Sequence, residues 1–231
     1  MSRTVNAEQA IAQARRVFAI ENQAIVDLQQ RIGEDFVAAV EMILNGSGHV
    51  VVIGMGKSGH IADKVSATLA STGTPAFFVH PGEASHGDLG MITSNDIVLA
   101  MSNSGETEEV LAILPVLKRM GIALISMTGK PNSTLAKNSD IHIDVSVNEE
   151  ACPLGLAPTA STTATLVMGD ALAITLLESR GFTKEDFARS HPAGSLGKRL
   201  LMGIRDVSRS RHDIPKVYAH TKLREALLVM T

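Results

Sequence analysis

Apolar side chains recur at helical spacing near the N-terminus of the chain. Between residues 6 and 45 they lie three, four or seven positions apart, which predicts amphipathic helices with one apolar stripe each. Gly33 interrupts the pattern, and the turn-forming residues 45–48 end it. We expect both helices to pack through their stripes on the domain that follows. The first stripe consists of Ile11, Ala14, Phe18, Ile25 and Leu28, and the second of Phe36, Val40 and Ile43.

The pattern changes after residue 48, where short apolar runs alternate with helical stretches. Each run is too short for a helix and rich in Val, Ile or Phe. Uninterrupted apolar runs are typical of strands buried on both faces, as in a parallel sheet. Their alternation with helices predicts an α/β fold, a three-layer αβα sandwich with a five-stranded, mostly parallel sheet. The predicted strands are 49–53, 76–79, 97–101, 122–127 and 141–145.

The last third of the sequence predicts one long helix and a change of composition. Residues 159–179 are apolar, and Gly181 is suited to end a helix there. Polar residues interrupt this stretch, which falls short of the roughly 18 uninterrupted apolar residues of a membrane span, so we expect a buried helix. Residues 182–197 have no periodicity and predict irregular structure. From about residue 207 the chain is basic and polar, and 223–230 predicts the start of another helix.

Composition narrows the class of protein. The 231 residues suffice for one large domain, or one domain plus a fragment. The net charge is −3 and only 3% of residues are aromatic, which argues against a nucleic-acid-binding protein. Cys152 is the single cysteine, so no intrachain disulfide can form, and residues 1–14 lack the apolar core of an export signal. We expect a cytoplasmic protein without a nucleic-acid or membrane partner.

Candidate chemistry follows the first predicted strand. Three glycines in residues 54–59 match the dinucleotide-binding pattern G-x-G-x-x-G. That pattern also needs an acidic residue at the end of the second strand, where this chain has His80. One interpretation of these glycines is a tight turn between strand and helix that binds no ligand. Lys57 and Ser58, at the start of a helix, suit an anion instead.

The segment after the third predicted strand is the most informative one. Residues 102–107 read S-N-S-G-E-T and bring three hydroxyls and an amide to a strand-to-helix junction. One hydroxyl is enough to cap a helix, and Ser104 is the candidate. The hydroxyls that are not needed for the cap favour the binding of a phosphate monoester. Glu109 would then face the carbon end of that ligand. An ordinary cap with glutamates that complement the helix dipole is the alternative. The candidate phosphate ligands are Ser102, Asn103, Ser104 and Thr107.

Two further places carry histidines that could act in catalysis. Residues 80–88 contain two histidines, a glutamate and an aspartate, which could be metal ligands or acid–base groups. A solvated loop is the alternative. His191 precedes Pro192 in the stretch without periodicity.

These motifs together resemble a known family. The glycine turn and the S-N-S-G-E-T segment resemble the sugar isomerase (SIS) domain, and within it the arabinose-5-phosphate isomerases. The resemblance covers about residues 10–205 and implies N-terminal helices at 1–46 and a SIS domain at 47–205. Residues 206–231 resemble the start of a CBS domain, of which only a truncated piece is present. The matching segments are 54–60, 71–75, 77–90, 102–106, 151–159 and 190–192.

The resemblance implies an activity and its residues. The reaction would be the interconversion of D-arabinose 5-phosphate and D-ribulose 5-phosphate, which feeds the lipopolysaccharide sugar 3-deoxy-manno-octulosonate (Kdo). It implies a homotetramer with sites between subunits, so that His191 serves a neighbour's site. It implies no required cofactor, and an inhibitory zinc ion at His80. The implied catalytic residues are Lys57, Glu109, Glu150 and His191, and the further implied substrate-binding residues are Gly73, Thr74, His80 and His86.

Aldose–ketose isomerisation is consistent with these side chains. A base moves a proton between two carbons through a cis-enediol, and a second group relays a proton between the oxygens. Lys57 would stabilise the enediolate or hold the phosphate. Glu109 and His191 are the acid–base candidates, in an order that the sequence leaves open, and Glu150 would orient one of them.

Two other functions remain open at this point. One is a SIS module that senses a sugar phosphate without catalysis, and the other is an isomerase of another phosphosugar, such as a heptose or a hexulose. The set of acid–base residues favours an enzyme over a sensing module. A purely structural protein would need no such polar cluster. A dehydrogenase would need an acidic residue at position 80, where this chain has a histidine.

Overall fold

The sheet of this protein is five-stranded and entirely parallel. The computed structural model describes residues 5–190 and 216–229, which divide into two units at residues 182 and 183. In the first unit the strand order is β2-β1-β3-β4-β5, and every neighbouring pair is parallel. All five predicted strands are confirmed to within one residue at each end. They are β1 (Val50–Gly54), β2 (Ala76–Val79), β3 (Ile97–Met101), β4 (Ala123–Thr128) and β5 (Ile141–Asp144).

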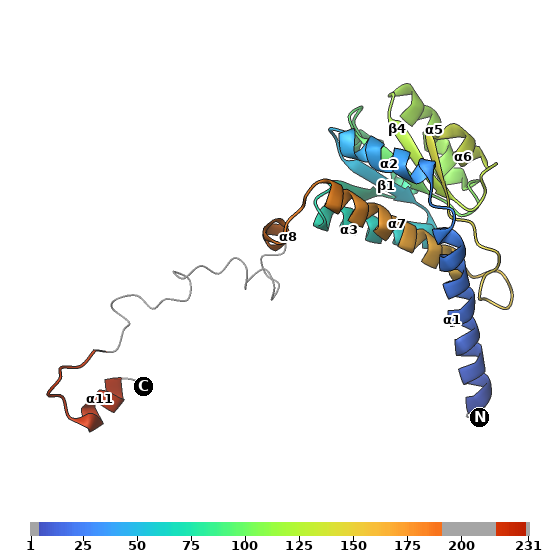
Figure 1. Ribbon diagram of the computed structural model, residues 1–231. Helices are drawn as coiled ribbons and strands as arrows, with labels where there is room; N and C mark the ends of the chain where they lie inside the picture. The colour runs from blue at the N-terminus through green and yellow to red at the C-terminus, as the bar shows by residue number, and fades with distance from the viewer. Residues whose placement is uncertain (1–4, 191–215, 230–231) are drawn as a thin grey trace. The chain divides into compact units, whose positions relative to one another are not determined.

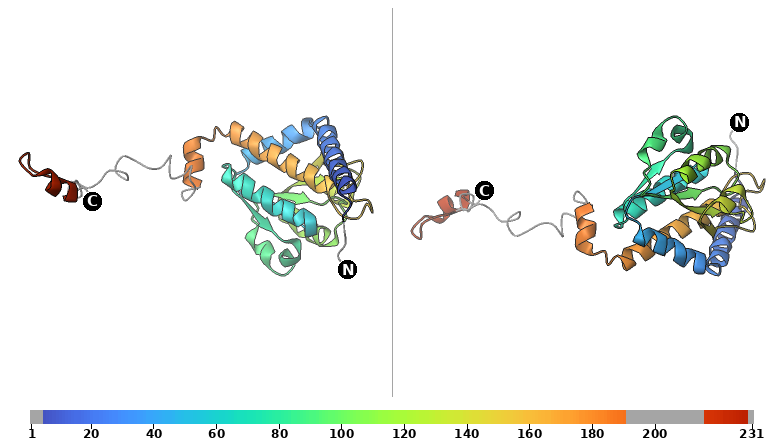
Figure 2. Two further views of the ribbon diagram at one scale, coloured as in Figure 1. Left: turned by 90° about the horizontal axis from the view of Figure 1, so that it is seen from below. Right: turned by 90° about the horizontal axis from the view of Figure 1, so that it is seen from above.

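Helices cover both faces of this sheet, which makes the predicted three-layer sandwich (Figures 1 and 2). Helices α2, α3 and α7 pack with one face in a single apolar cluster, and α4, α5 and α6 contribute to the cluster on the other face. The helices of the first unit are α1 (Ala7–Gln29), α2 (Glu34–Asn45), α3 (Gly56–Ser71), α4 (Pro81–Ala84), the 3₁₀ helix η1 (Asp88–Met91), α5 (Glu108–Arg119), α6 (Thr134–Asn138) and α7 (Ala160–Ser179).

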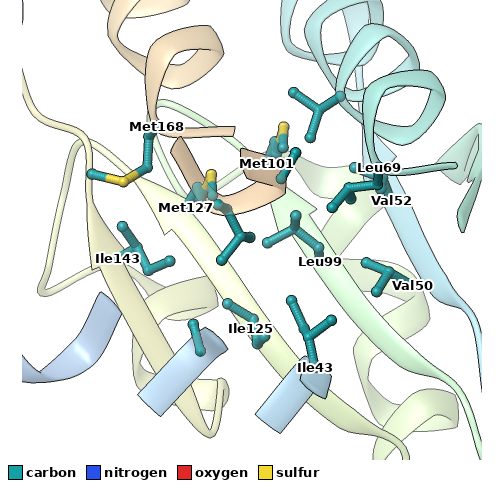
Figure 3. Packing of buried hydrophobic residues seen from close by; sticks show 14 of the residues in the cluster. Ile43, Val50, Val52, Leu69, Leu99, Met101, Ile125, Met127, Ile143 and Met168 are labelled. Atoms are coloured by element: carbon teal, nitrogen blue, oxygen red, sulfur yellow. The ribbon is translucent and has the colours of Figure 1, made fainter. Parts of the chain in front are cut away.

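The two layers explain why the strands are continuously apolar. Successive side chains of a strand point to opposite faces, so Val50 and Val52 join one cluster while Val51 and Ile53 join the other. β1 and β3 lie inside the sheet and are buried along their whole length. Figure 3 shows the first cluster, where aliphatic side chains from four strands meet those of the covering helices.

Helix α7 is the central helix of that layer. It has the length and hydropathy of a membrane span, yet half of its apolar window is buried inside the protein. It packs against α1, α2 and α3, as the predicted buried helix requires. Gly169 permits the close approach of α3, because a Cβ atom there would lie 2.4 Å from Cγ2 of Val65.

The apolar stripe predicted for α1 is buried only in the second half of the helix. Ala24 and Leu28 are buried, whereas Ile11 and Phe18 are 54% and 78% exposed. The second half lies along α7, and the first half extends beyond the rest of the unit (Figure 1). The expectation that the whole stripe packs on the domain is therefore wrong for residues 11–18 within one chain.

The second unit contains helices α8 (Lys184–Ser190) and α11 (Leu223–Val229). Helix α11 confirms the predicted helix start at residue 223. Helix α8 corrects the expectation that residues 182–197 are irregular for residues 184–190, whereas residues 191–197 lie outside the described residues. Thr183 and Asp186 form a reciprocal cap, in which each side chain accepts a hydrogen bond from the backbone N–H of the other. Such a cap can be recognised in sequence as Thr-x-x-Asp.

The contact between Gly169 and Val65 predicts that Gly169→Val destabilises the fold. Val65 is fully buried, so the added side chain forces α3 and α7 apart. We expect a loss of about 1–3 kcal/mol in the free energy of unfolding, measured by urea denaturation, as overpacking typically causes. Ile174→Val, at a half-exposed position of the same helix, is the control and should change stability by less than about 0.5 kcal/mol. An unchanged stability of Gly169→Val would contradict this account of the helix crossing.

Candidate active site

The candidate site lies where neighbouring strands β1 and β3 end side by side. Gly54 is paired with Met101 in the register of these strands. From β1 the chain enters α3 on one face of the sheet, and from β3 it enters α5 on the other face. The two loops therefore diverge and leave a crevice at the carboxyl ends of the strands, which is where open α/β sheets bind ligands.

The glycine turn after β1 forms one side of the crevice. A Cβ atom on Gly59 would lie 2.7 Å from the carbonyl oxygen of Gly54, so the turn closes tightly only with glycine there. Lys57 and Ser58 lie in the first turn of α3, whose cap residue makes no side-chain hydrogen bond to the helix. The Lys57 side chain is exposed and forms no ion pair within residues 5–190 and 216–229. The turn thus presents N–H groups and an ammonium group to an anion.

The S-N-S-G-E-T loop after β3 forms the other side. The Ser102 and Thr107 hydroxyls are 2.8 Å apart, and the Ser102 hydroxyl also accepts from the N–H of Gly105 at 3.0 Å. Thr107, rather than the predicted Ser104, is the residue at the N-cap of α5. Ser104 instead accepts from the N–H of Glu106 at 3.1 Å. The helix starts later than expected because the loop makes one more turn at Gly105, whose φ is +65°.

Two glutamates of this region have different surroundings. The carboxylate of Glu106 accepts from the backbone N–H of Thr134 at 2.7 Å, and this hydrogen bond lowers the pKa of Glu106. Its role is to tie the loop to α6. Glu109 lies in the first turn of α5, and its side chain is exposed. Of the two, Glu109 is therefore the one available to a ligand.

Glu150 is anchored at the N-terminus of α7. Its Oε2 accepts from the N–H and the hydroxyl of Thr159 at 2.7 and 2.9 Å, and from the N–H of Ser161 at 3.3 Å. Burial alone would raise the pKa of Glu150, but the hydrogen bonds from Ser161 and Thr159 outweigh it, so the pKa lies below its ordinary value. The carboxylate stays ionised near neutral pH and holds the loop before α7 against the start of that helix.

A small pocket of about 30 Å³ lies between these parts. It joins α3, the loop after β3 and the start of α7, so the three segments converge in one chain. Ser58 and Asn103 were predicted from the sequence, whereas the residues of α7 were not. The hydroxyls clustered at the start of the predicted long helix are the same kind of signal as the hydroxyls of residues 102–107. The pocket is lined by Ser58, Ile61, Asn103, Pro158, Ser161, Thr162 and Thr165.

The remaining predicted residues do not line this pocket. His80 is the N-cap of α4, and its Nδ1 is buried without a hydrogen-bond partner in the part of the chain described. His86 is exposed in the loop that follows α4. Gly73 and Thr74 precede β2, so they lie at the amino edge of the sheet, opposite to Lys57, and Thr74 accepts there from Arg180 at 3.2 Å.

Two predictions on histidines are not settled by these positions. His191 lies outside the described residues. Among the residues that are described, no three His, Cys, Asp or Glu side chains gather as a metal site. Zinc inhibition at His80 therefore stays a prediction.

Comparison with known proteins places these features in one family. The SIS domain matches residues 43–175. The arabinose 5-phosphate isomerase of Pseudomonas aeruginosa is 60% identical over 221 residues, which is 96% of this chain and 68% of that protein. The arabinose 5-phosphate isomerase of Yersinia pestis is 61% identical over 94% of this chain and 66% of its own length. The chain thus spans about two thirds of these relatives.

A solved structure extends the likeness to three dimensions. The Escherichia coli CFT073 protein c3406, in complex with arabinose 5-phosphate, superposes with a TM-score of 0.79 at 46% identity. The match covers 81% of this chain and all of that one.

The lowered pKa of Glu150 predicts a pH-dependent contribution to stability. Because the folded pKa is depressed, the ionised carboxylate stabilises the fold above its ordinary pKa of 4.5, and this stabilisation is lost as the pH falls through the folded pKa. At pH 7 we expect Glu150→Gln to unfold more easily by about 1–2 kcal/mol, the typical value of a helix cap. The difference should shrink in urea denaturation series below pH 4. Glu149→Gln, at the exposed neighbour, is the control, and a pH-independent difference for Glu150→Gln would refute the assignment.

Proposed function

This chain belongs to the SIS domain family, and we propose that it is an arabinose-5-phosphate isomerase that interconverts D-arabinose 5-phosphate and D-ribulose 5-phosphate. One observation carries the proposal. The turn with Lys57 and the S-N-S-G-E-T loop flank a single crevice at the ends of β1 and β3. Relatives that bear this activity in their names share about 60% of the residues.

The crevice supplies what a phosphate monoester needs. The hydroxyls of residues 102–107 donate hydrogen bonds, and the first turn of α3 offers backbone N–H groups at the positive end of its dipole. The Lys57 ammonium adds a positive charge at the same place, in a chain whose net charge is −3. The phosphate therefore fixes one end of the sugar, and the aldehyde end extends toward the acid–base groups.

The reaction itself is a pair of proton transfers. A base removes the proton from C2 of the aldose, the C1–C2 double bond forms, and O1 takes up a proton to give the cis-enediol. The proton then returns to C1 while O2 loses its proton, which leaves the ketone at C2. No electrons are exchanged with a partner, so the chemistry requires no redox cofactor. We assign Glu109 and His191 to the proton transfers and Lys57 to the charge on oxygen or phosphate.

Glu150 acts through the start of α7 in this scheme. Its ionised carboxylate orients the wall of the pocket that Ser161 and Thr162 form. Gly73 and Thr74 belong to the substrate site only if a second chain completes it, since they lie at the opposite edge of the sheet from Lys57. His80 follows the carboxyl end of β2, at the same edge as Lys57, and we assign His80 and His86 to substrate binding.

We further propose a cytoplasmic homotetramer with sites between subunits. The first half of α1 supports this, because its exposed apolar residues, Phe18 above all, would be covered by another subunit. The pathway would be Kdo and lipopolysaccharide synthesis, and residues 206–231 would open a CBS domain.

Proton NMR of the chain with D-arabinose 5-phosphate in D₂O tests the activity directly. We expect D-ribulose 5-phosphate to appear with deuterium on carbon, because the transferred proton exchanges with solvent. Lys57→Ala should lower kcat by about 10²-fold or more, as loss of a preorganised charge does, without loss of fold. Lys64→Ala is the matched control, since Lys64 lies on the same helix and pairs with Asp170 instead.

The outcomes of that experiment separate the alternatives. If the substrate raises the melting temperature but is not converted, the chain is a sensing module, which would contradict the proposal. If another phosphosugar is converted and arabinose 5-phosphate is not, the substrate assignment is wrong.

Mixing two inactive variants tests whether sites form between subunits. Lys57→Ala and His191→Ala should each be inactive, yet hybrid oligomers should regain part of the activity. In these hybrids some sites combine an intact Lys57 with an intact His191 of another chain. The measurement is turnover after dissociation and reassembly, with subunit exchange verified by native mass spectrometry. Absence of recovery in verified hybrids would place both residues of a site in one chain.

A further inference from the structure

We propose that Glu21 and Asp27 of α1, together with Arg31 just after its end, are positioning residues of the isomerase. They hold in place the connecting segment, residues 144–163, which runs from the last residue of β5 to the first turn of α7. This inference rests on the proposed function. It concerns residues that neither line the site pocket nor belong to the S-N-S-G-E-T loop.

Three polar links join α1 to the connecting segment in a regular order. Arg31 donates to the carbonyl oxygen of Ser146 at 2.5 Å and lies 3.6 Å from the carboxylate of Asp144. Within the last turn of α1, Asp27 accepts from the side-chain amide of Asn148 at 2.8 Å. The later a residue lies in the connecting segment, the closer its bonding partner lies to the N-terminus of the chain.

The third link reaches the first turn of α7. The carboxylate of Glu21 accepts from the hydroxyl of Thr163 at 2.9 Å. The links therefore lie on both sides of Glu150 and next to the pocket wall. Glu150 lies two residues after Asn148, and Thr163 directly follows Thr162 of the pocket wall.

Apolar packing attaches only the beginning of the segment to α1, because Val145 and Val147 share an apolar cluster with Leu28. Further along, a cavity of about 90 Å³ lies between α1 and residues Asn148 and Glu149, so polar bonds make the attachment there. Asp27 is also fixed from its own helix, because it accepts from the amide of Gln23 at 2.7 Å. A carboxylate held in this way offers a defined anchor point to Asn148.

The links thereby set the position of two elements of the site. The bond between Asp27 and Asn148 fixes the backbone position just before Glu150. The carboxylate of Glu150 in turn binds the start of α7. Glu21 and Thr163 determine how the first turn of α7 faces the pocket. Displacements of the order of 1 Å in such supports are enough to slow catalysis.

Two substitutions test the inference through a split between kcat and KM. Thr163→Val keeps the shape of the side chain and removes its hydrogen bond, so the pocket wall loosens and KM should rise about threefold to tenfold with a smaller change in kcat. Asp27→Ala releases Asn148 next to Glu150, so kcat should fall about threefold to tenfold with little change in KM. Both ranges correspond to the loss of one hydrogen bond.

The conservative variants and a control make the test specific. Thr163→Ser keeps a hydroxyl, and Asp27→Asn keeps an acceptor oxygen. Their KM and kcat should therefore stay close to those of the unmodified chain. Asp170→Asn removes a link of α7 to Lys64 on α3 instead of α1, and should leave both constants unchanged. A role in stability alone would reduce the amount of folded protein and leave KM and kcat per folded chain as they were, which would overturn the inference.

Hydrogen exchange of the ligand-free protein provides a readout independent of turnover. Backbone amides of residues 148–163 should exchange faster in Thr163→Val and in Asp27→Ala than in the unmodified chain. Unchanged exchange in this segment would also overturn the inference. If the unmodified chain shows no turnover but exchange responds as expected, the proposed function fails and the positioning by α1 stands.

Discussion

The parallel pairing of β1 with β3 is the constraint on which the site depends. Both strands are buried on both faces, so their register, with Gly54 opposite Met101, is fixed by two apolar clusters at once. The loops that follow inherit this alignment and bring a lysine and a set of hydroxyls to one crevice. The catalytic machinery therefore owes its geometry to residues such as Val51 and Leu99, which have no chemical role of their own.

Most of the fold could be predicted because strands buried on both faces appear in the sequence as short uninterrupted apolar runs. Runs such as 97–101 are uninterrupted, unlike an exposed strand, and too short for a typical helix, and the structure has a strand at each of the five. The exposure of Phe18 could not be predicted, because spacing shows that a helix has an apolar face but not how much of that face a neighbour covers. Helix α8 was missed because it is short and only its cap is distinctive.

The candidate site was predictable where it follows directly from strand ends. Ser58 and Asn103 lie in loops whose position follows from the sheet, and both line the pocket. Ser161 and Thr162 come from a helix after an irregular loop, and no local pattern shows where that loop leads. Resemblance to a family had to supply Glu150, and the structure adds that its carboxylate caps the start of α7. Gly73 and Thr74 came from the same resemblance, and one chain alone does not join them to Lys57.

The contact of α1 with α7 also has a consequence for how the protein is made. Glu21 and Thr163 are 142 positions apart in the chain, yet they are bonded in the fold. At about 5–20 residues per second, the ribosome needs roughly 7–28 s to synthesise α7 after α1 has emerged. During that interval Leu28 lacks the α7 side chains of the apolar cluster that buries it in the fold, so the nascent chain carries an apolar face that α7 covers only later. The earliest helix to be synthesised is thus among the last to find its full packing partner.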